Sequence, residues 1–134
     1  MRENLFRGKK IESGEWVEGY LIKQDNPEYH CYIVVSFKAE QDNRHTDILE
    51  CDIFEVVPET IGQYTGCCDK NGKKIFEGDI LKFRPGTYYP VVYDMDYGAF
   101  GSCYFSDFDF LHKYDFKKIE VVGNIYDNPE LLRR

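Results

Sequence analysis

The segment 61–80 holds the densest run of turn-forming residues in the chain and constrains its fold most strongly. Asn71 and Gly72 are the pair that favours a two-residue type I′ hairpin, because both tolerate a positive φ. Residues 73–76 would then run back along residues 64–65. The segment therefore predicts an antiparallel hairpin, with β-strands before and after it.

A second reversal or a bulge is predicted at Glu77-Gly78, and residues 80–83 have the β-branched and aromatic content of a short strand. Asp79 lies between them and has two interpretations. It is either a turn aspartate that accepts backbone N–H groups or a catalytic or metal-binding carboxylate, and Asp beside Gly favours the turn. Glu77 is better explained as a solvated or hairpin-pairing residue than as an acid catalyst. No His or Ser nearby in sequence completes a catalytic constellation.

Alternating apolar residues and turn signals predict further strands on both sides of this segment. Those before it are 5–9, 16–22, 29–37 and 47–57; those after it are 88–93, 99–105, 107–110 and 119–126. The fold class is therefore mainly β, either a small barrel-like fold or two β modules packed together. The modules would span 1–58 and 59–134, although one continuous domain remains open. Helix is expected only as a terminal turn near 128–134, with Asn128 as cap and Pro129 at the first helical position.

Several strands carry more specific expectations. Gly19 and Gly123 each predict a bulge. The run 29–37 has apolar residues on both faces and is expected to be buried on both sides. Pro90 predicts an edge strand. Residues 107–110 alternate as a strand does, but could instead open a short helix with Ser106 as N-cap.

The formal net charge of −7 argues against direct nucleic-acid binding and against anionic membranes, both of which need a basic surface. It leaves open a basic protein partner, or an acidic surface that imitates a nucleic acid. The basic start of the chain (Arg2, Arg7, Lys9, Lys10) could oppose this acidic body. We expect no signal peptide, no membrane span and a cytoplasmic protein.

The five cysteines are odd in number and include no Cys-x-x-Cys pair. They are interpreted as reduced thiols of a cytosolic protein, including the adjacent Cys67 and Cys68. Structural zinc needs ligands in closely spaced pairs, which the cysteines and histidines do not offer, so we expect no metal and no cofactor. A cysteine nucleophile with His45 or His112 as its base remains open, because the pairing would be spatial.

Aromatic side chains have similarly open interpretations. Trp16, the single tryptophan, is better explained as a core or rim anchor than as a platform for ligand stacking. The segment 93–116 is rich in Asp, Phe and Tyr. It either fills a core and leaves an acidic rim or forms a partner-binding surface.

Three motifs resemble those of the YopX family of phage and prophage proteins. The central one runs from Thr60-Ile-Gly-Gln-Tyr-Thr-Gly through Asp69-x-Asn-Gly-Lys to Ile75-Phe-Glu-Gly-Asp-Ile. The start, with Phe6-Arg-Gly-Lys and Gly14-Glu-Trp-Val-x-Gly-Tyr, and the end, Glu120-Val-Val-Gly-Asn-Ile-Tyr, resemble its flanking motifs. The resemblance covers nearly the whole chain. It implies a mainly β phage or prophage protein of unknown activity that can form oligomers.

The motif residues that we single out as signature or structural residues are Gly62, Tyr64, Thr65, Gly66, Asp69, Asn71, Gly72, Glu77, Gly78, Asp79, Gly123 and Asn124. No catalytic or cofactor-binding residue is assigned. The leading function is a phage or prophage accessory protein, a non-enzymatic module that self-associates as a homo-oligomer or binds a host or phage protein. The alternative is a small hydrolase or transferase that uses Asp79 and Glu77 or a Cys–His pair.

Overall fold

The structure is a computed structural model that describes residues 4–104, 107–111 and 115–133; the side chains of residues 37, 49, 103, 104 and 107–109 lie outside the description. The chain forms two compact units, Asn4–Gln63 and a second that starts at Tyr64. The division expected near Pro58 therefore falls after Gln63. The intervening 3-10 turn η1 (Pro58–Thr60) belongs with the first unit, where the Lys9 N–H donates to Thr60 Oγ1 at 2.9 Å.

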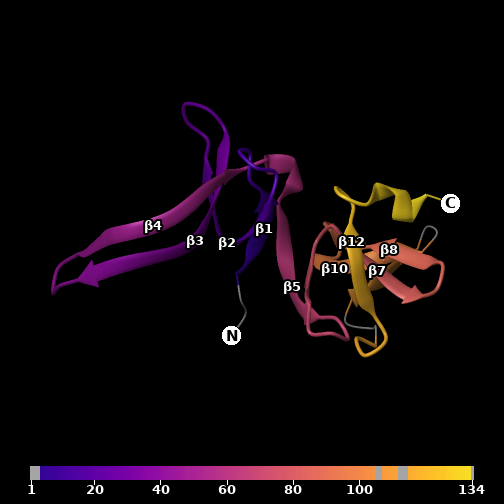
Figure 1. Cartoon of the computed structure of the whole chain (residues 1–134). Helices are drawn as coiled ribbons and strands as arrows, with labels where there is room; N and C mark the ends of the chain where they lie inside the picture. The colour runs from indigo at the N-terminus through magenta and orange to yellow at the C-terminus, as the bar shows by residue number, and fades with distance from the viewer. Residues whose placement is uncertain (1–3, 105–106, 112–114, 134) are drawn as a thin grey trace. The chain divides into compact units, whose positions relative to one another are not determined.

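Strands make up most of both units, so the mainly β prediction is confirmed (Figure 1). The described strands form several open sheets and do not close a barrel. In chain order the strands are β1 (Phe6–Lys9), β2 (Trp16–Gln24), β3 (His30–Gln41), β4 (Thr46–Val56), β5 (Gly62–Cys68), β6 (Lys74–Phe76), β7 (Asp79–Arg84), β8 (Thr87–Pro90), β9 (Val92–Asp94), β10 (Ala99–Tyr104), β11 (Asp107–Phe110) and β12 (Glu120–Asn124).

The N-terminal unit is an antiparallel sheet in the order β4-β3-β2-β1, with the first residues of β5 beside β1. β2 changes partner along its length: Trp16–Gly19 pair with β1 and Tyr20–Gln24 pair with β3. The bulge predicted at Gly19 is wrong, because neither register shifts there. Gly19 instead allows a close backbone approach, since a Cβ built on it would lie 2.2 Å from the Val34 carbonyl oxygen.

Beyond Val34, strands β3 and β4 pair only with each other in the register (Figure 1). We call residues 34–41 and 46–53, which comprise this two-stranded part and the Val34–Ile53 pair at its base, the β3–β4 ribbon. Its ladder has two irregularities, one between Val34 and Ser36 and one between Lys38 and Ala39. Such bulges bend a ribbon and increase its twist.

The core of the N-terminal unit lies on one face of the sheet. Val17, Cys31, Ile33 and Val56 are buried there, with Leu21, Phe54 and Ile61 packed against them. The expectation that 29–37 is buried on both sides fails at both ends, because Tyr29 is 53% exposed, Val35 is 44% exposed and Ser36 is exposed too. The bulge at Val35 and the end of the pairing with β2 leave the outer ribbon without a covering layer among the described residues. The side chain of Phe37 lies outside the described residues.

The C-terminal unit contains the β5–β6 hairpin and two three-stranded sheets, β12-β7-β8 and β11-β10-β9. Its core consists of Ile75, Leu81, Val91, Leu111, Ile119 and Val121. β8, which contains Pro90, is an edge strand, as predicted. The predicted strand 88–93 is split into β8 and β9. Buried Val91 separates them, and its N–H donates to the Asp79 carbonyl at 2.8 Å.

Near the C-terminus the predicted helical turn is present as the 3-10 helix η3 (Pro129–Leu132), with Pro129 at its start. Asn128 is its N-cap residue, as predicted, but the Asn128 side chain makes no cap hydrogen bond. Its Oδ1 instead accepts the Asn124 N–H at 3.2 Å. Residues 107–110 are a strand and not a helix; Ser106 lies outside the described residues.

Candidate functional site

Asp69 organises the hairpin turn between β5 and β6. Its Oδ1 accepts the N–H groups of Asn71 and Lys73, both at 2.9 Å, and its Oδ2 accepts the Val121 N–H of β12 at 2.9 Å. The predicted hairpin is present, but the predicted two-residue type I′ turn is wrong. The Asp69 N–H donates to the Lys73 carbonyl, so the loop has three residues, and Gly72 has a φ of +79°. A three-residue loop ending in a left-handed Gly is a common alternative to the type I′ turn.

The Asp69 carboxylate is only 6% exposed, and its charge is stabilised by these donors. Burial raises the pKa of this carboxyl, but the N–H groups of Val121, Lys73 and Asn71 and the charge of Lys73 outweigh burial and hold the pKa below its usual 3.8. The ionised carboxylate therefore joins the central motif to the C-terminal motif.

Asp79 has a similar position in the next turn. Its side chain is 1% exposed, and its Oδ2 accepts the Phe76 N–H at 2.8 Å. Gly78 provides the reversal between β6 and β7 with a φ of +93°, and its N–H donates to the Val91 carbonyl at 2.9 Å. An enclosed carboxylate that accepts a backbone N–H has the geometry of a turn aspartate. Asp79 is not accessible to a substrate in this arrangement.

The remaining residues of the central motif support the same hairpin. Thr65 Oγ1 donates to the Ile75 carbonyl at 2.7 Å, and the Tyr64 ring lies 5.6 Å from that of Phe76. Gly66 has a φ of +87° where the β5–β6 ladder is irregular. Gly62 pairs with β1 in the N-terminal unit, and Glu77 is half-buried in the turn before Asp79.

Asn124 organises the C-terminal motif. Its Oδ1 accepts the N–H groups of Tyr126 and Asp127 at 3.0 and 2.9 Å, and its Nδ2 donates to Asp127 Oδ2 at 3.1 Å. Gly123 lies at the predicted bulge, where the register with β7 shifts. A Cβ on Gly123 would lie 2.5 Å from Asn128 Oδ1, so the bulge and the Asn128 contact require glycine.

The candidate catalytic and metal-binding groups do not converge in the described part of the chain. No group of three or more His, Cys, Asp or Glu residues there could hold a metal ion. Cys31, Cys51, Cys67 and Cys68 are free thiols. Burial raises the pKa of the Cys67 thiol, which disfavours the thiolate that a nucleophile needs. His112 lies outside the described residues.

His30 lies at the base of β3 between two carboxylates. Its Nδ1 is 2.8 Å from Glu55 Oε2, and its Nε2 is 3.3 Å from Glu28 Oε2. The hydrogen bond to Glu55, and then that to Glu28, raise the pKa of this imidazole above 6.5. The cluster is a surface ion-pair group that ties the start of β3 to the end of β4.

Trp16 is half-buried and lies beneath basic side chains. The Arg7 guanidinium carbon lies 4.7 Å from the centroid of its ring and Lys9 Nζ lies 5.5 Å from it. Such cation–π contacts stabilise the start of the chain against β2. Two of the four basic residues noted in the sequence thus stack on Trp16. Arg2 lies outside the described residues.

One face of the N-terminal sheet, opposite its core, exposes an unusual amount of apolar surface. A groove of about 260 Å³ lies on it, and its lining contains no charged residue: Tyr20, Ile22, Val34, Ile48, Cys51 and Ile53. Ile48 is 65% exposed, Tyr20 57% and Ile53 44%. We call the surface formed by these six residues the uncharged face; Glu18 and Glu55 lie on the same side of the sheet, outside the groove. Solvated faces of antiparallel sheets are normally polar, so this surface is the candidate site.

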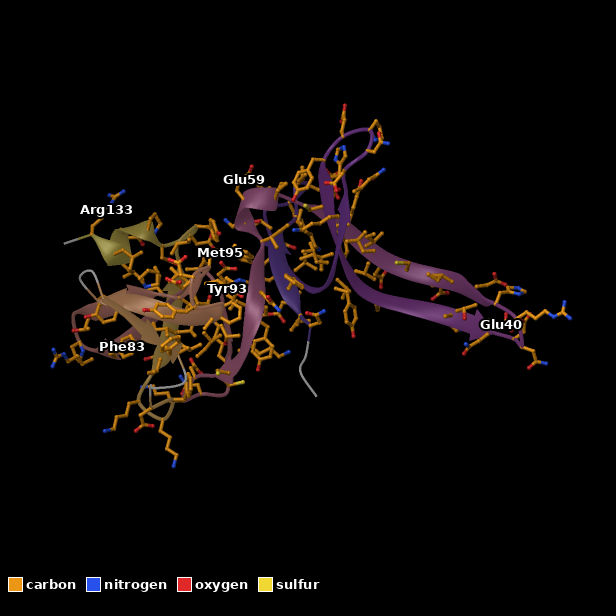
Figure 2. The ribbon with its side chains drawn as sticks, turned by 180° about the vertical axis from the view of Figure 1, so that it is seen from behind. Glu40, Glu59, Phe83, Tyr93, Met95 and Arg133 are labelled. Atoms are coloured by element: carbon orange, nitrogen blue, oxygen red, sulfur yellow. The ribbon has the colours of Figure 1, made fainter. Side chains whose placement is uncertain are left out.

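The opposite face of the β3–β4 ribbon is polar and acidic. Ser36 pairs with Asp52, Lys38 with Glu50 and Glu40 with Asp47 in the register. Ser36 Oγ donates to Asp52 Oδ2 at 2.8 Å. Figure 2 shows the ribbon's side chains as sticks, with Glu40 labelled at its outer end. The ribbon is therefore amphipathic, with its carboxylates on one face and its aliphatic groups on the other.

The acidic and aromatic segment 93–116 combines packing with exposure. The Tyr93 and Phe100 rings lie 5.0 Å apart, and those of Tyr97 and Phe110 5.1 Å apart. Tyr93 is nevertheless 40% exposed, Tyr97 64% and Met95 85%, and Figure 2 labels Tyr93 and Met95. The ring contacts fit the interpretation that this segment fills a core. The exposure of these side chains fits the interpretation that it forms a partner-binding surface.

A family model described as "YopX protein" matches residues 5–133. The chain belongs to the YopX family. The resemblance drawn from its motifs is thereby confirmed. Its structure is also similar to the crystal structure of protein EF1440 from Enterococcus faecalis, with a TM-score of 0.70 and 26% identity, over 99% of this chain and 100% of that one. No curated protein matches the sequence.

The uncharged face was not anticipated from the sequence. The alternation of apolar and polar residues in 47–57 gives the signal, but it is also typical of a strand whose apolar face meets a core. The decisive fact, that nothing described covers this face, comes only from the structure.

Proposed function

We propose that this YopX-family chain is a non-enzymatic protein-binding or self-associating module that docks through its uncharged face. The observation that carries the proposal is the exposure of Tyr20, Ile48 and Ile53 around one groove. Burying such side chains contributes about 25 cal/mol per Å² of apolar surface removed from water. The motif carboxylates support this choice over the enzyme, because Asp69 and Asp79 are enclosed by backbone donors.

The cellular setting is proposed from family membership. A phage or prophage accessory protein that acts in the host cytosol fits the free thiols of the four described cysteines. Within the described residues, no helix is long and apolar enough to cross a membrane. The partner would be another copy of the chain or a host or phage protein.

Imitation of a nucleic acid finds little support in the placement of the acids. Asp47, Glu50 and Asp52 follow β4 on one face, so carboxylates recur about every 7 Å along the strand. Lys38 also lies opposite Glu50 and interrupts the row. The acidic row is thus short and contains a basic residue, whereas every unit of a phosphate backbone carries the same negative charge.

The proposal is tested with two neighbouring substitutions on opposite faces of the ribbon. Ile48→Asp places a carboxylate on the uncharged face, and Glu50→Gln removes one from the other face as a matched control. Light scattering gives the mass of each purified protein, and pull-downs with each as bait show which partners are retained. We expect wild type and Glu50→Gln to share an assembly or partner that Ile48→Asp loses. Equal behaviour of all three would refute the uncharged face as the docking surface.

A further inference from the structure

We infer that the occupant of the uncharged face is a second copy of this chain, packed face to face in a two-fold symmetric dimer. The inference rests on the proposed function and identifies its partner. It is carried by the distribution of charge over the β3–β4 ribbon together with the position of the groove.

Charge determines which surfaces two copies can share. Each copy carries a net charge of −7, so association brings like charges together unless the shared surface is free of them. The groove lining meets this condition, since none of its six residues is charged, and the carboxylates of Glu18 and Glu55 on the same side of the sheet lie beyond it. In a face-to-face pair, Asp47, Glu50 and Asp52 of both copies would point outward. Packed sheets are about 10 Å apart, so these outer carboxylates are separated by more than the Debye length of about 8 Å.

The other way for two such ribbons to meet is edge to edge through β4, which is the outermost strand of its sheet. Antiparallel pairing of β4 with its own copy would place two rows of carboxylates, from Asp47 to Asp52, side by side on one face. Like charges on neighbouring strands destabilise the pairing, and natural edge strands use charge in this way to avoid self-association. The ribbon therefore disfavours contact by its edge and permits contact by its uncharged face.

The same distribution disfavours an unrelated basic partner at this surface. Basic proteins are attracted and oriented by complementary charge at the contact. The ribbon's carboxylates lie on the face away from the groove and would draw a basic protein there. None of the six groove residues is charged, so the groove itself does not attract or orient a basic protein. A two-fold contact requires one patch that is complementary to itself. The uncharged face meets this requirement, because the groove and the projecting side chains around it, such as Ile48, belong to the same patch.

Cys51 provides a test of this geometry. It is an exposed free thiol that lines the groove, between Ile48 and Ile53 on β4. A two-fold axis through the patch would bring Cys51 of the two copies close together. Treating the Cys68→Ser variant, which lacks the other exposed described thiol, with a short bismaleimide would join them by two thioether bonds. A peptide that links Cys51 to Cys51 necessarily comes from two chains.

We expect this Cys51–Cys51 product from a dimer seen by light scattering. Ile48→Asp in the same background should weaken dimerisation by about tenfold or more, which corresponds to about 1.4 kcal/mol, and Glu50→Gln should not. A monomer at every concentration, or a dimer cross-linked only at other cysteines, would overturn the inference. If a monomer retains a partner that Ile48→Asp loses, this inference fails and the proposed function stands. If Ile48→Asp changes neither assembly nor partner, both fail.

Discussion

The C-terminal unit buries polar groups and the β3–β4 ribbon exposes apolar ones. In the first region, the enclosed carboxylates of Asp69 and Asp79 accept backbone N–H groups. In the second, Ile48 and Ile53 are exposed on the face of the sheet opposite the core. Buried polar groups with satisfied partners indicate a role in specifying the fold, whereas exposed apolar groups contribute little to it. Stability therefore rests with the family's central motif, and the proposed docking surface lies outside that motif.

The largest loss of stability is expected at Asp69, in the region that buries polar groups. Asp69→Ala leaves three backbone N–H groups of the turn and of β12 without their acceptor. We expect a loss of about 4 kcal/mol in the free energy of unfolding, since each unsatisfied buried donor costs about 1–3 kcal/mol. Urea unfolding measures it, with exposed Asp96→Ala of the same unit as control. A loss similar to that of the control would show that the Asp69 carboxylate does not hold the turn.

Low pH should destabilise the protein through the same Asp69 carboxylate. Because the pKa of Asp69 is lowered in the folded state, its stabilisation is present above the unfolded value of 3.8 and is lost as the pH falls through the lower folded pKa. Wild type should therefore lose more stability below pH 3.8 than Asp69→Asn does. Urea midpoints measured at descending pH test this, and parallel curves for the two proteins would contradict it.

A smaller loss is expected at Gly19, where the N-terminal sheet changes partner. Gly19→Ala would put a Cβ 2.2 Å from the Val34 carbonyl oxygen, so the backbone must move, at a cost of about 3 kcal/mol. Gly72→Ala is the matched control, because its Cβ meets open space and only its φ of +79° is unfavourable, at about 1 kcal/mol. Gly19→Ala should therefore lower the midpoint of thermal unfolding more than Gly72→Ala does. A smaller loss at Gly19 than at Gly72 would contradict the close approach.

His30 offers a mild and pH-dependent effect at the base of the ribbon. Its raised pKa means that its stabilisation is fully present below the unfolded value of 6.5 and is lost as the pH rises through the folded pKa. NMR titration should place the pKa of His30 above 6.5, and Glu55→Gln should lower it. An unchanged titration midpoint in Glu55→Gln would show that the hydrogen bond at 2.8 Å is not maintained in solution.

The smallest effect on stability is expected on the uncharged face. Ile48→Asp should change the free energy of unfolding of the monomer by less than about 0.5 kcal/mol, because the side chain is 65% exposed. Denaturation at a low protein concentration, where any dimer has dissociated, measures this. A loss of several kcal/mol would mean that Ile48 belongs to a core and not to a docking surface.

The strands and the hairpin could be predicted from the sequence because they depend on local chemistry. The left-handed Gly72 and Gly78, the bulge at Gly123 and the edge position of Pro90 follow from properties of single residues. The details of the turns were less predictable. The Asp69 carboxylate accepts N–H groups from Asn71 inside the loop, from Lys73 after it and from Val121, more than fifty residues away. These bonds favour a three-residue loop over the type I′ turn.

Exposure of the ribbon could not be predicted in the same way. The pattern of 29–37 and 47–57 specifies which side chains share a face, but a covered apolar face and an open one have the same alternation. Gly19 was misjudged for a related reason: a close approach by Val34, distant in sequence, and not a local bulge, requires glycine there. Tertiary context decides both, and with them the candidate site.

The most direct test of the central claim compares the reactivities of two exposed thiols, Cys51 on the uncharged face and Cys68 in the C-terminal unit. Each is alkylated with iodoacetamide at low and at high protein concentration, and light scattering reports the mass at both. We predict that alkylation of Cys51 slows as the mass increases, while that of Cys68 does not. An increase in mass with unchanged alkylation of Cys51 would contradict the claim, as would a constant mass over the whole concentration range.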